Sequence, residues 1–302
     1  MILVVGGLGF IGSHATRALL DLGHECVVVQ RSAGRPGSPP IERADVTDLE
    51  ALRDIGRRHH ITGIIHLAGA GLGADPIADQ WAGTQALLNV LQVAVDWQVK
   101  RVGIASTIGV YDGGGDSPLR EDAPLPLTAG HAIPAAKKVA EVLGGYLGSA
   151  TGMEVYSMRI GAVWGPGGRP ASRFFAAPQL VHAAARGETT QPVFAEGGID
   201  MIYVKDCGRA IAMLQTASRL RHQVYNVASG RATANAELVE AIKAVVPEAL
   251  IDVRAGRDPH GLGGDVYLDV TRARADSGFE PGYDTRAAVA DYIGWLQVGN
   301  ER

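Results

Sequence analysis

Strand-like and helix-like segments alternate along the first half of the chain. Strands are predicted at residues 1–5, 24–30, 41–46, 62–69, 99–107 and 153–161; the second of these ends in a Val-rich run. Helices are predicted at residues 13–23, 48–58, 75–98 and 134–150, with Thr47 as the N-cap of the second. Strands that alternate with helices form βαβ units, so the pattern predicts a parallel sheet covered on both faces.

The alternation loosens after Gly161, where a Gly- and Pro-rich loop is followed by helices and short strands in no strict order. Right-handed crossovers make the first part a doubly wound sheet of the Rossmann type, in the α/β class. We therefore predict a dinucleotide-binding domain at residues 1–160. Residues 161–302 are predicted to form a smaller substrate lobe, partly interleaved with that domain.

Composition narrows the class of protein. Of the 302 residues, 46% are hydrophobic and 20% are charged, as in a soluble globular protein, and the net charge of −4 argues against a nucleic-acid partner. No signal segment or membrane-spanning run stands out, so a cytoplasmic protein is expected. Cys26 and Cys207 are expected to be buried free thiols, and the histidines and cysteines match no metal-binding motif. A small-molecule substrate is the expected partner.

The segment Val-Val-Gly-Gly-Leu-Gly-Phe-Ile-Gly follows the first predicted strand and leads into the first predicted helix. Glycines at this point permit a tight turn and bring the backbone close to a pyrophosphate at the helix N-terminus. The context of strand, turn and helix favours dinucleotide binding over a plain glycine-rich turn. The expected contacts to the dinucleotide are Gly6, Gly9, Phe10, Ile11 and Gly12.

The end of the second strand bears on the choice of cofactor. An acidic residue here would take the ribose hydroxyls of NAD, but Gln30 occupies this place. Arg31 and Ser32 follow, with Arg35 nearby, and a guanidinium can pair with a 2′-phosphate. These residues favour NADP(H) over NAD(H), although Arg31 and Arg35 could also be ordinary solvated charges.

Seven segments in order along the chain resemble the extended short-chain dehydrogenase/reductases of the NAD-dependent epimerase/dehydratase family. They are GGLGFIG, ADVTD, IIHLAG, STIGVYDGG, RIGAVWGPG, IDMIYVKDCGRAI and the closing region from YNVASG onward. The resemblance implies that Asp45 and Val46 contact the adenine end of the cofactor. It also implies that Leu67, Ala68 and Gly69 line the cofactor and that Thr107 stands at the catalytic Ser/Thr position.

The chain departs from this family where the chemistry is expected. The family's Tyr-x-x-x-Lys falls on Ile133 and Lys137, with Glu141 fixing the register. Polar residues of the family are also replaced by Gln80, Ala162 and Ile199. A phenol with its pKa lowered by a nearby ammonium can exchange a proton with an alcohol, whereas Ile133 cannot. Lys137 would then keep the task of holding the nicotinamide ribose.

Three residues could supply the missing polar group. His131 titrates near neutral pH, Tyr111 follows the strand that ends in Thr107, and Thr107 could polarise a substrate oxygen. Three functions remain open on the sequence. The first is an NADP(H)-dependent oxidoreductase or epimerase, acting on a small hydroxylated or carbonyl compound with a non-Tyr proton donor. The others are a non-redox lyase or isomerase on the same fold, and a non-catalytic nucleotide-binding sensor.

The helices predicted at residues 75–98 and 134–150 carry more apolar residues than one sheet face requires, including Trp81, Leu87, Leu88, Leu91, Val139, Val142, Leu143 and Tyr146. In the family that the chain resembles, these two helices pair with their mates in a four-helix interface. A homodimer is therefore expected.

Overall fold

The computed structural model describes residues 1–31, 39–69, 75–112, 116–261 and 264–300. A seven-stranded sheet runs through the first part of the molecule in the order β11-β6-β5-β4-β1-β2-β3. All neighbouring strands in it are parallel. The strands are β1 (Ile2–Val5), β2 (Cys26–Gln30), β3 (Ile41–Arg43), β4 (Gly63–His66), β5 (Arg101–Thr107), β6 (Glu154–Ile160) and β11 (Val224–Val227). This confirms the predicted doubly wound, Rossmann-type α/β fold.

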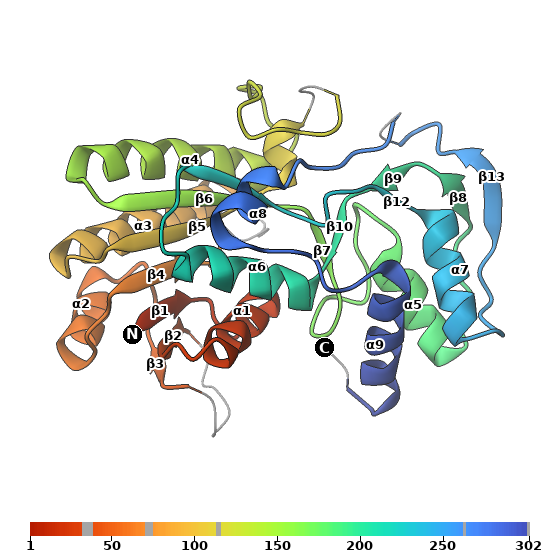
Figure 1. Ribbon diagram of the computed structural model, residues 1–302, viewed down its shortest axis with the longest axis horizontal. Helices are drawn as coiled ribbons and strands as arrows, with labels where there is room; N and C mark the ends of the chain where they lie inside the picture. The colour runs from red at the N-terminus through yellow and green to blue at the C-terminus, as the bar shows by residue number, and fades with distance from the viewer. Residues whose placement is uncertain (32–38, 70–74, 113–115, 262–263, 301–302) are drawn as a thin grey trace.

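Helices cover both faces of this sheet (Figure 1). They are α2 (Leu49–Arg58), α3 (Pro76–Asp96) and α4 (Ala132–Thr151) on one face, and α1 (Phe10–Asp21), α6 (Val204–Thr216) and α8 (Thr271–Ser277) on the other. Side chains alternate between the faces along a strand. Leu3 accordingly packs under α2 and α3, whereas Val4 packs under α1 and α6. Strand β1 is therefore apolar on both sides, which is why it is a continuous apolar run in the sequence.

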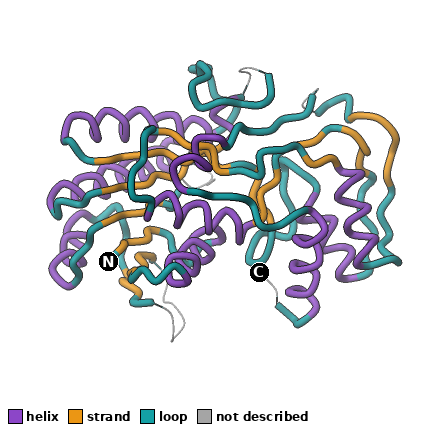
Figure 2. The backbone as a smooth tube through the Cα atoms, in the orientation of Figure 1, coloured by secondary structure: helices purple, strands orange, loops and turns teal. Residues whose placement is uncertain are grey.

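A second hydrophobic core lies beyond the carboxyl ends of the strands, on the right in Figures 1 and 2. Trp164, Leu180, Ile242 and Tyr292 are among its buried members. Its helices are α5 (Ala177–Arg186), α7 (Asn235–Val245) and α9 (Thr285–Gln297). Its short strands are β7 (Ala162–Trp164), β8 (Val193–Glu196), β9 (Gly198–Ile199), β10 (Met201–Tyr203), β12 (Thr233–Ala234) and β13 (Val253–Arg257). Between these elements the chain returns through α6 and β11 to the main sheet.

Several predicted boundaries were wrong. Helix α1 begins at Phe10 rather than Ser13, because the glycine turn leads directly into the helix. The N-cap of α2 is Asp48, whose carboxylate accepts a hydrogen bond from the Ala51 N–H (3.1 Å), and not Thr47, which donates to Asp45. The strand predicted at residues 41–46 ends at Arg43. Helix α4 begins at Ala132, so Ile133 belongs to its first turn.

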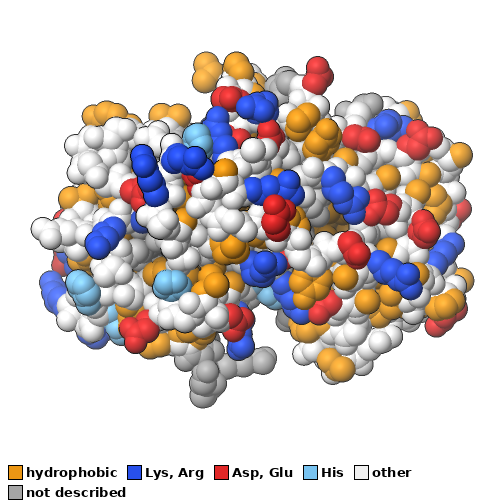
Figure 3. All heavy atoms as spheres, viewed as in Figure 1, with side chains coloured by type: hydrophobic (Ala, Val, Ile, Leu, Met, Phe, Trp, Pro, Cys, Tyr) orange, Lys and Arg blue, Asp and Glu red, His pale blue; other side chains and the backbone are white. Residues whose placement is uncertain are grey.

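Both cysteines are buried and free, as expected. Within the described part of the chain, no group of three or more His, Cys, Asp or Glu side chains could hold a metal ion. None of the described helices is both long enough and apolar enough to cross a membrane. On the face shown in Figure 3, acidic and basic side chains are interspersed.

Candidate functional site

The glycine turn between β1 and α1 is packed so closely that side chains do not fit. Gly6 has a positive φ of 81°, a conformation that L residues rarely adopt. A Cβ on Gly12 would lie 2.1 Å from the Gly6 carbonyl oxygen, so this position can only be glycine. The Gly9 N–H donates to the same oxygen (3.0 Å), and α1 begins at the next residue. The N–H groups of the first turn of α1 therefore point out of the turn, an arrangement that suits a phosphate.

Phe10 and Ile11 have different surroundings. The Phe10 ring packs against Gly168, in the loop that follows β7, where a Cβ would approach it to 3.0 Å. Ile11 packs against the first hydrophobic core. His14 Nε2 lies 3.0 Å from the Pro166 carbonyl oxygen. The start of α1 is thus joined to the loop at residues 165–168 as well as to the sheet.

The ends of β4 and β2 flank the glycine turn. A Cβ on Gly6 would lie 3.2 Å from the Ala68 nitrogen, so Leu67 and Ala68 run beside the turn, while Gly69 is open to solvent. Arg31 is exposed just after β2, and its carbonyl oxygen accepts a hydrogen bond from Arg43 Nε (3.1 Å). Ser32 and Arg35 lie outside the described residues.

Asp45 and Val46 lie beyond the end of β3. The Asp45 Oδ1 atom accepts hydrogen bonds from the Thr47 N–H (2.9 Å) and hydroxyl (2.8 Å). These two bonds, with a smaller contribution from the Arg31 charge, lower the pKa of the Asp45 carboxyl. The Val46 carbonyl oxygen accepts from Asn89 Nδ2 (3.0 Å), which ties this segment to α3. Asp45 is exposed and its carboxylate is held in a fixed orientation beside the end of β2.

A cavity of about 910 Å³ opens at the end of β5, and we call it the central cavity. Thr107, Tyr111, His131 and Ile133 line it. It is also lined by Ala162, Ile199, the segment Arg173–Phe175 and the residues Asp258, His260, Gly261, Gly264, Asp265 and Val266. Thr107 is the last residue of β5, and its hydroxyl oxygen accepts a hydrogen bond from the Gly109 N–H (3.2 Å). The sequence-predicted residues Thr107, Tyr111, His131 and Ile133 therefore come together around one space.

His131 stands at the N-cap of α4 and is exposed at the edge of the central cavity. Its ring stacks on the Phe174 ring with a centroid separation of 5.3 Å. Two residues further along, Ile133 is half-buried in the cavity wall. Gln80 of α3 donates from Nε2 to the Ala132 carbonyl oxygen (3.1 Å) and so fixes the start of α4 rather than facing the cavity.

The neighbouring lysines Lys137 and Lys138 differ sharply. Lys138 Nζ donates to the carbonyl oxygens of Pro126 (2.6 Å) and Thr128 (2.5 Å), which holds the preceding loop against α4. Lys137 lies four residues after Ile133 and therefore on the same face of the helix. Burial lowers the pKa of Lys137 to about 8, and its charge contributes to lowering the pKa of buried His66, on β4, to about 3. Lys137 is thus the lysine directed toward the sheet.

Tyr111 belongs to a buried polar network. Its hydroxyl donates to Asn226 Oδ1 (2.8 Å) and accepts from Arg159 Nη1 (2.9 Å). Burial raises the pKa of the Tyr111 hydroxyl, although the Arg159 charge opposes this. Asn226 Nδ2 also donates to the Leu119 and Asp269 carbonyl oxygens. The Tyr111 hydroxyl therefore has both of its roles, donor and acceptor, committed to the network.

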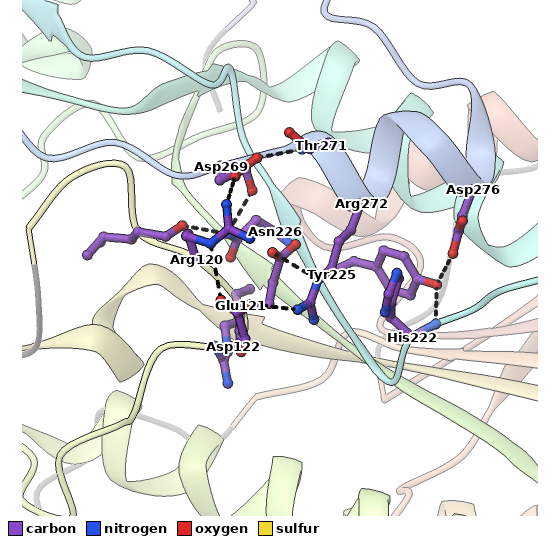
Figure 4. A network of polar contacts seen from close by, with 12 residues as sticks. Arg120, Glu121, Asp122, His222, Tyr225, Asn226, Asp269, Thr271, Arg272 and Asp276 are labelled. Atoms are coloured by element: carbon purple, nitrogen blue, oxygen red, sulfur yellow. Dashed lines mark hydrogen bonds and ion pairs between the residues drawn. The ribbon is translucent and has the colours of Figure 1, made fainter.

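Glu121 and Arg272 extend this network to α8 (Figure 4). Glu121 Oε1 accepts from the Asn226 N–H (2.9 Å), and its other oxygen lies 3.5 Å from Arg272 Nε. Burial raises the pKa of Glu121. The loop that carries residues 116–131 past the cavity is thus fixed at Glu121 to both β11 and α8.

Sequence reasoning missed the wall of the central cavity that comes from late in the chain. Phe174, Phe175, Asp258 and His260 line it but lie in loops far along the chain from Thr107. Leu119 and Leu268 form a bridge that brings the two loops together. A His and two Asp residues in a Gly-rich stretch at residues 256–265 were the available signal, because functional side chains concentrate on loops.

Comparison with known proteins agrees with this geometry. The model of the NAD dependent epimerase/dehydratase family matches residues 2–228. UDP-glucose 4-epimerase of Azospirillum brasilense is 28% identical over 94% of this chain and 88% of its own. The structure of Thermus thermophilus UDP-glucose 4-epimerase in complex with NAD has a TM-score of 0.80 at 24% identity, covering 99% of each chain. The Bifidobacterium longum enzyme in complex with NAD⁺ and UDP has a TM-score of 0.83 at 21% identity, over 99% of this chain and 98% of that one.

Proposed function

The chain belongs to the NAD-dependent epimerase/dehydratase family and is an enzyme of the extended short-chain dehydrogenase/reductase type, and on this premise we propose what it does. It binds a nicotinamide cofactor along the carboxyl edge of the main sheet. It then oxidises, reduces or epimerises a small hydroxylated or carbonyl compound in the central cavity. Residues 1–160 hold the cofactor, and residues 161–302 contribute the substrate lobe.

One observation carries this proposal: the glycine turn and Thr107 lie at the same edge of the sheet, on strands separated only by β4. A dinucleotide with its pyrophosphate at the glycine turn and its adenine end toward β2 has its other end toward β5. The central cavity opens at that end. The reacting ring and the substrate space are thereby brought together.

The residues at this end of the site have separate roles. The cofactor, when bound, supplies or accepts a hydride. Lys137 is half-buried and forms no ion pair with any described carboxylate, so its ammonium is available to the cofactor ribose. Thr107 can hydrogen-bond a substrate oxygen, and His131 can accept or donate the proton, because both line the cavity. Tyr111 serves instead as a positioning residue for the loop, because its hydroxyl is held by Arg159 and Asn226.

We further propose a preference for NADP(H). Gln30 stands at the end of β2 where a carboxylate would bind the ribose of NAD, and Arg31 follows it with an exposed guanidinium. Structural neighbours in complex with NAD argue for the other nicotinamide nucleotide. The proposal rests on the residues of this chain, since the identity to these neighbours is below 25%.

A non-redox lyase or isomerase step is the second candidate. The observation that favours it is Ile133, which places an alkyl group in the cavity one helical turn from Lys137. An alkyl side chain exchanges no proton with a substrate. In this case the same cavity binds the substrate, and the cofactor is not consumed in the net reaction.

The proposed assembly is a homodimer through α3 and α4. Ile77, Trp81, Val142 and Tyr146 on these helices have 68–80% of their surface exposed. Large apolar side chains gathered on two packed helices mark an interface.

Titration with NADPH and NADH tests the function, with the fluorescence of the reduced nicotinamide as the signal. Lys137→Met should weaken NADPH binding at least about tenfold, since a charge-assisted hydrogen bond is lost. Lys138→Met is the matched control and should change the affinity by less than about twofold, because Lys138 faces the loop at residues 126–128. Absence of saturable binding of either nucleotide to the parent protein would show that the proposal is wrong.

A further inference from the structure

The central cavity has an apolar interior. Ile133, Val163, Ile199 and Val266 are half-buried in its wall, and Leu119 and Ala162 are buried. These six side chains come from five different segments of the chain, including α4, β7 and β9. A ligand that fills this interior therefore gains most by burying apolar surface.

The charged side chains of the cavity lie at its rim. Among the described lining residues, Asp112, Asp116, Asp258 and Asp265 are carboxylates and Arg173 is the guanidinium, and all five are exposed. Asp265 is neutralised by Arg257, whose Nη1 lies 3.0 Å from its Oδ1. The carboxylates of Asp112, Asp116 and Asp258 then outnumber the single guanidinium group of Arg173 in the described lining.

The formal charges of these aspartates and of Arg173 leave the lining net negative, and the exposed His131 and His260 are the histidines that also face the cavity. A ligand that carries negative charge is repelled at the rim, and this repulsion is weakened but not removed by salt.

Among its described residues, the wall also offers few of the groups that hold a diphosphate. Phosphate oxygens are bound by guanidinium groups and by the N–H groups of helix N-termini. Arg173 is exposed at the rim rather than placed in the interior. The helix that starts at the cavity, α4, has Pro134 in its first turn, and Pro has no N–H to offer.

We propose that the central cavity takes a substrate without phosphate: an alcohol or ketone with an apolar body that is either uncharged or carries an amine. The reactive oxygen meets Thr107, the apolar body lies against Ile133 and Ile199, and any ammonium group lies at the acidic rim. This inference rests on the proposed function, because it assigns the substrate class of the same site. Nucleoside diphosphate sugars are excluded from the cavity by charge.

Three aromatic ketones that share the acetophenone core test whether the cavity selects its ligands by charge. They are acetophenone, which is neutral, 4-(aminomethyl)acetophenone, which is cationic, and 4-acetylbenzoate, which is anionic. UDP-glucose is the fourth probe. Calorimetric titration of each into the NADP⁺-loaded protein at pH 7.5 should give at least tenfold tighter binding of the neutral and cationic ketones than of 4-acetylbenzoate and UDP-glucose.

Variants of the rim residues distinguish the effect of charge on ligand affinity from the effect of ligand shape. The double variant Asp112→Asn, Asp258→Asn should bind 4-acetylbenzoate at least threefold more tightly and leave acetophenone unchanged. Asp54→Asn removes an exposed carboxylate of α2 that does not line the cavity. It should change the affinity for neither ketone. An equal gain in affinity for 4-acetylbenzoate in the double variant and in Asp54→Asn would overturn the proposal.

The outcomes distinguish this inference from the function on which it rests. If neither NADP⁺ nor NAD⁺ binds to the protein, the proposed function fails. If NADP⁺ loads but UDP-glucose or 4-acetylbenzoate binds as tightly as acetophenone, or no ketone binds, the substrate class is wrong and the cofactor site stands.

Discussion

Arg159 of β6 and Glu141 of α4 form a buried ion pair in which two guanidinium nitrogens donate three hydrogen bonds of 2.8–3.2 Å. The Ser106 hydroxyl adds a fourth bond to the Glu141 carboxylate, from the residue before Thr107. This pair therefore connects the helix that carries Lys137 to the strand that carries Thr107. The relative placement of the cofactor-binding and substrate-binding groups depends on it.

Glu141→Gln should lower the free energy of unfolding by about 3–5 kcal/mol, because it leaves the Arg159 charge buried without a partner. Denaturant unfolding measures the loss. Asp21→Asn is the control, since Asp21 pairs with Arg17 on the exposed face of α1, and it should cost less than about 1 kcal/mol. Losses of the same size in both variants would contradict a structural role for the buried pair.

Arg31→Ala should weaken NADPH binding by about tenfold and leave NADH binding nearly unchanged, because only the 2′-phosphate contact is lost. Nucleotide fluorescence titration gives both constants. Arg57→Ala, on an exposed turn of α2, serves as the control for a change in net charge. Equal losses for the two nucleotides, or tighter NADH binding in the parent protein, would be inconsistent with the assignment of Arg31.

Turnover of a ketone identified by the binding experiments should depend on Thr107 and His131. Thr107→Ala and His131→Ala should each lower kcat by about a hundredfold, the scale of general acid–base catalysis. Tyr111→Phe should instead lower stability, since its hydroxyl is part of the buried network. Ile133→Tyr should not produce a fast dehydrogenase, because Ala162 and Ile199 keep the cavity wall apolar. Parent activity in both alanine variants would place the chemistry elsewhere.

Val142→Glu should convert the proposed dimer to a monomer, because it puts a charge into the apolar surface of α3 and α4. Val142 is 70% exposed in the single chain. Light scattering at micromolar concentration reads the mass directly. Leu250→Glu changes an exposed leucine after α7 and should leave the mass unchanged. A monomer mass for the parent protein would refute the interface.

Stability should fall as the pH drops from about 6.5 toward 3 because of His66. Its pKa is lowered by burial, and further by the Lys137 charge, to about 3, while in the unfolded chain it is about 6.5. Between these values the unfolded chain holds the extra proton, so acid favours unfolding by up to about 1.4 kcal/mol per pH unit. His66→Asn should reduce this slope, and the exposed His60→Asn should not. Identical slopes in all three proteins would show that His66 does not titrate in this way.

The sequence was sufficient for the sheet because its strands are apolar on both faces and its helices alternate with them. The glycine turn was equally predictable, since Gly6 and Gly12 meet steric demands that no other residue satisfies. The N-cap of α2 was misplaced because Thr47 and Asp48 are both good N-cap residues, and the choice depends on Asp45, which engages Thr47.

The chemical half of the site was less predictable. Tyr111 looked like a candidate proton donor, but its partners Arg159 and Asn226 come from strands β6 and β11, over 40 residues away in the chain. No local pattern reveals such contacts. The acidic rim was missed for the same reason, since Asp112 and Asp258 are brought together only by the pairing of the two loops at Leu119 and Leu268.

Gly208 of α6 lies directly against the backbone of α1, where a Cβ would come within 2.5 Å of the His14 carbonyl carbon. A methyl group in the later half of the chain would thus push on the helix whose first turn is proposed to face the cofactor phosphates. Recombination between relatives is constrained accordingly. A chimaera that keeps the first 160 residues and imports the remainder must bring glycine at this position, or its inherited nucleotide site will be distorted by a partner that never touches the nucleotide.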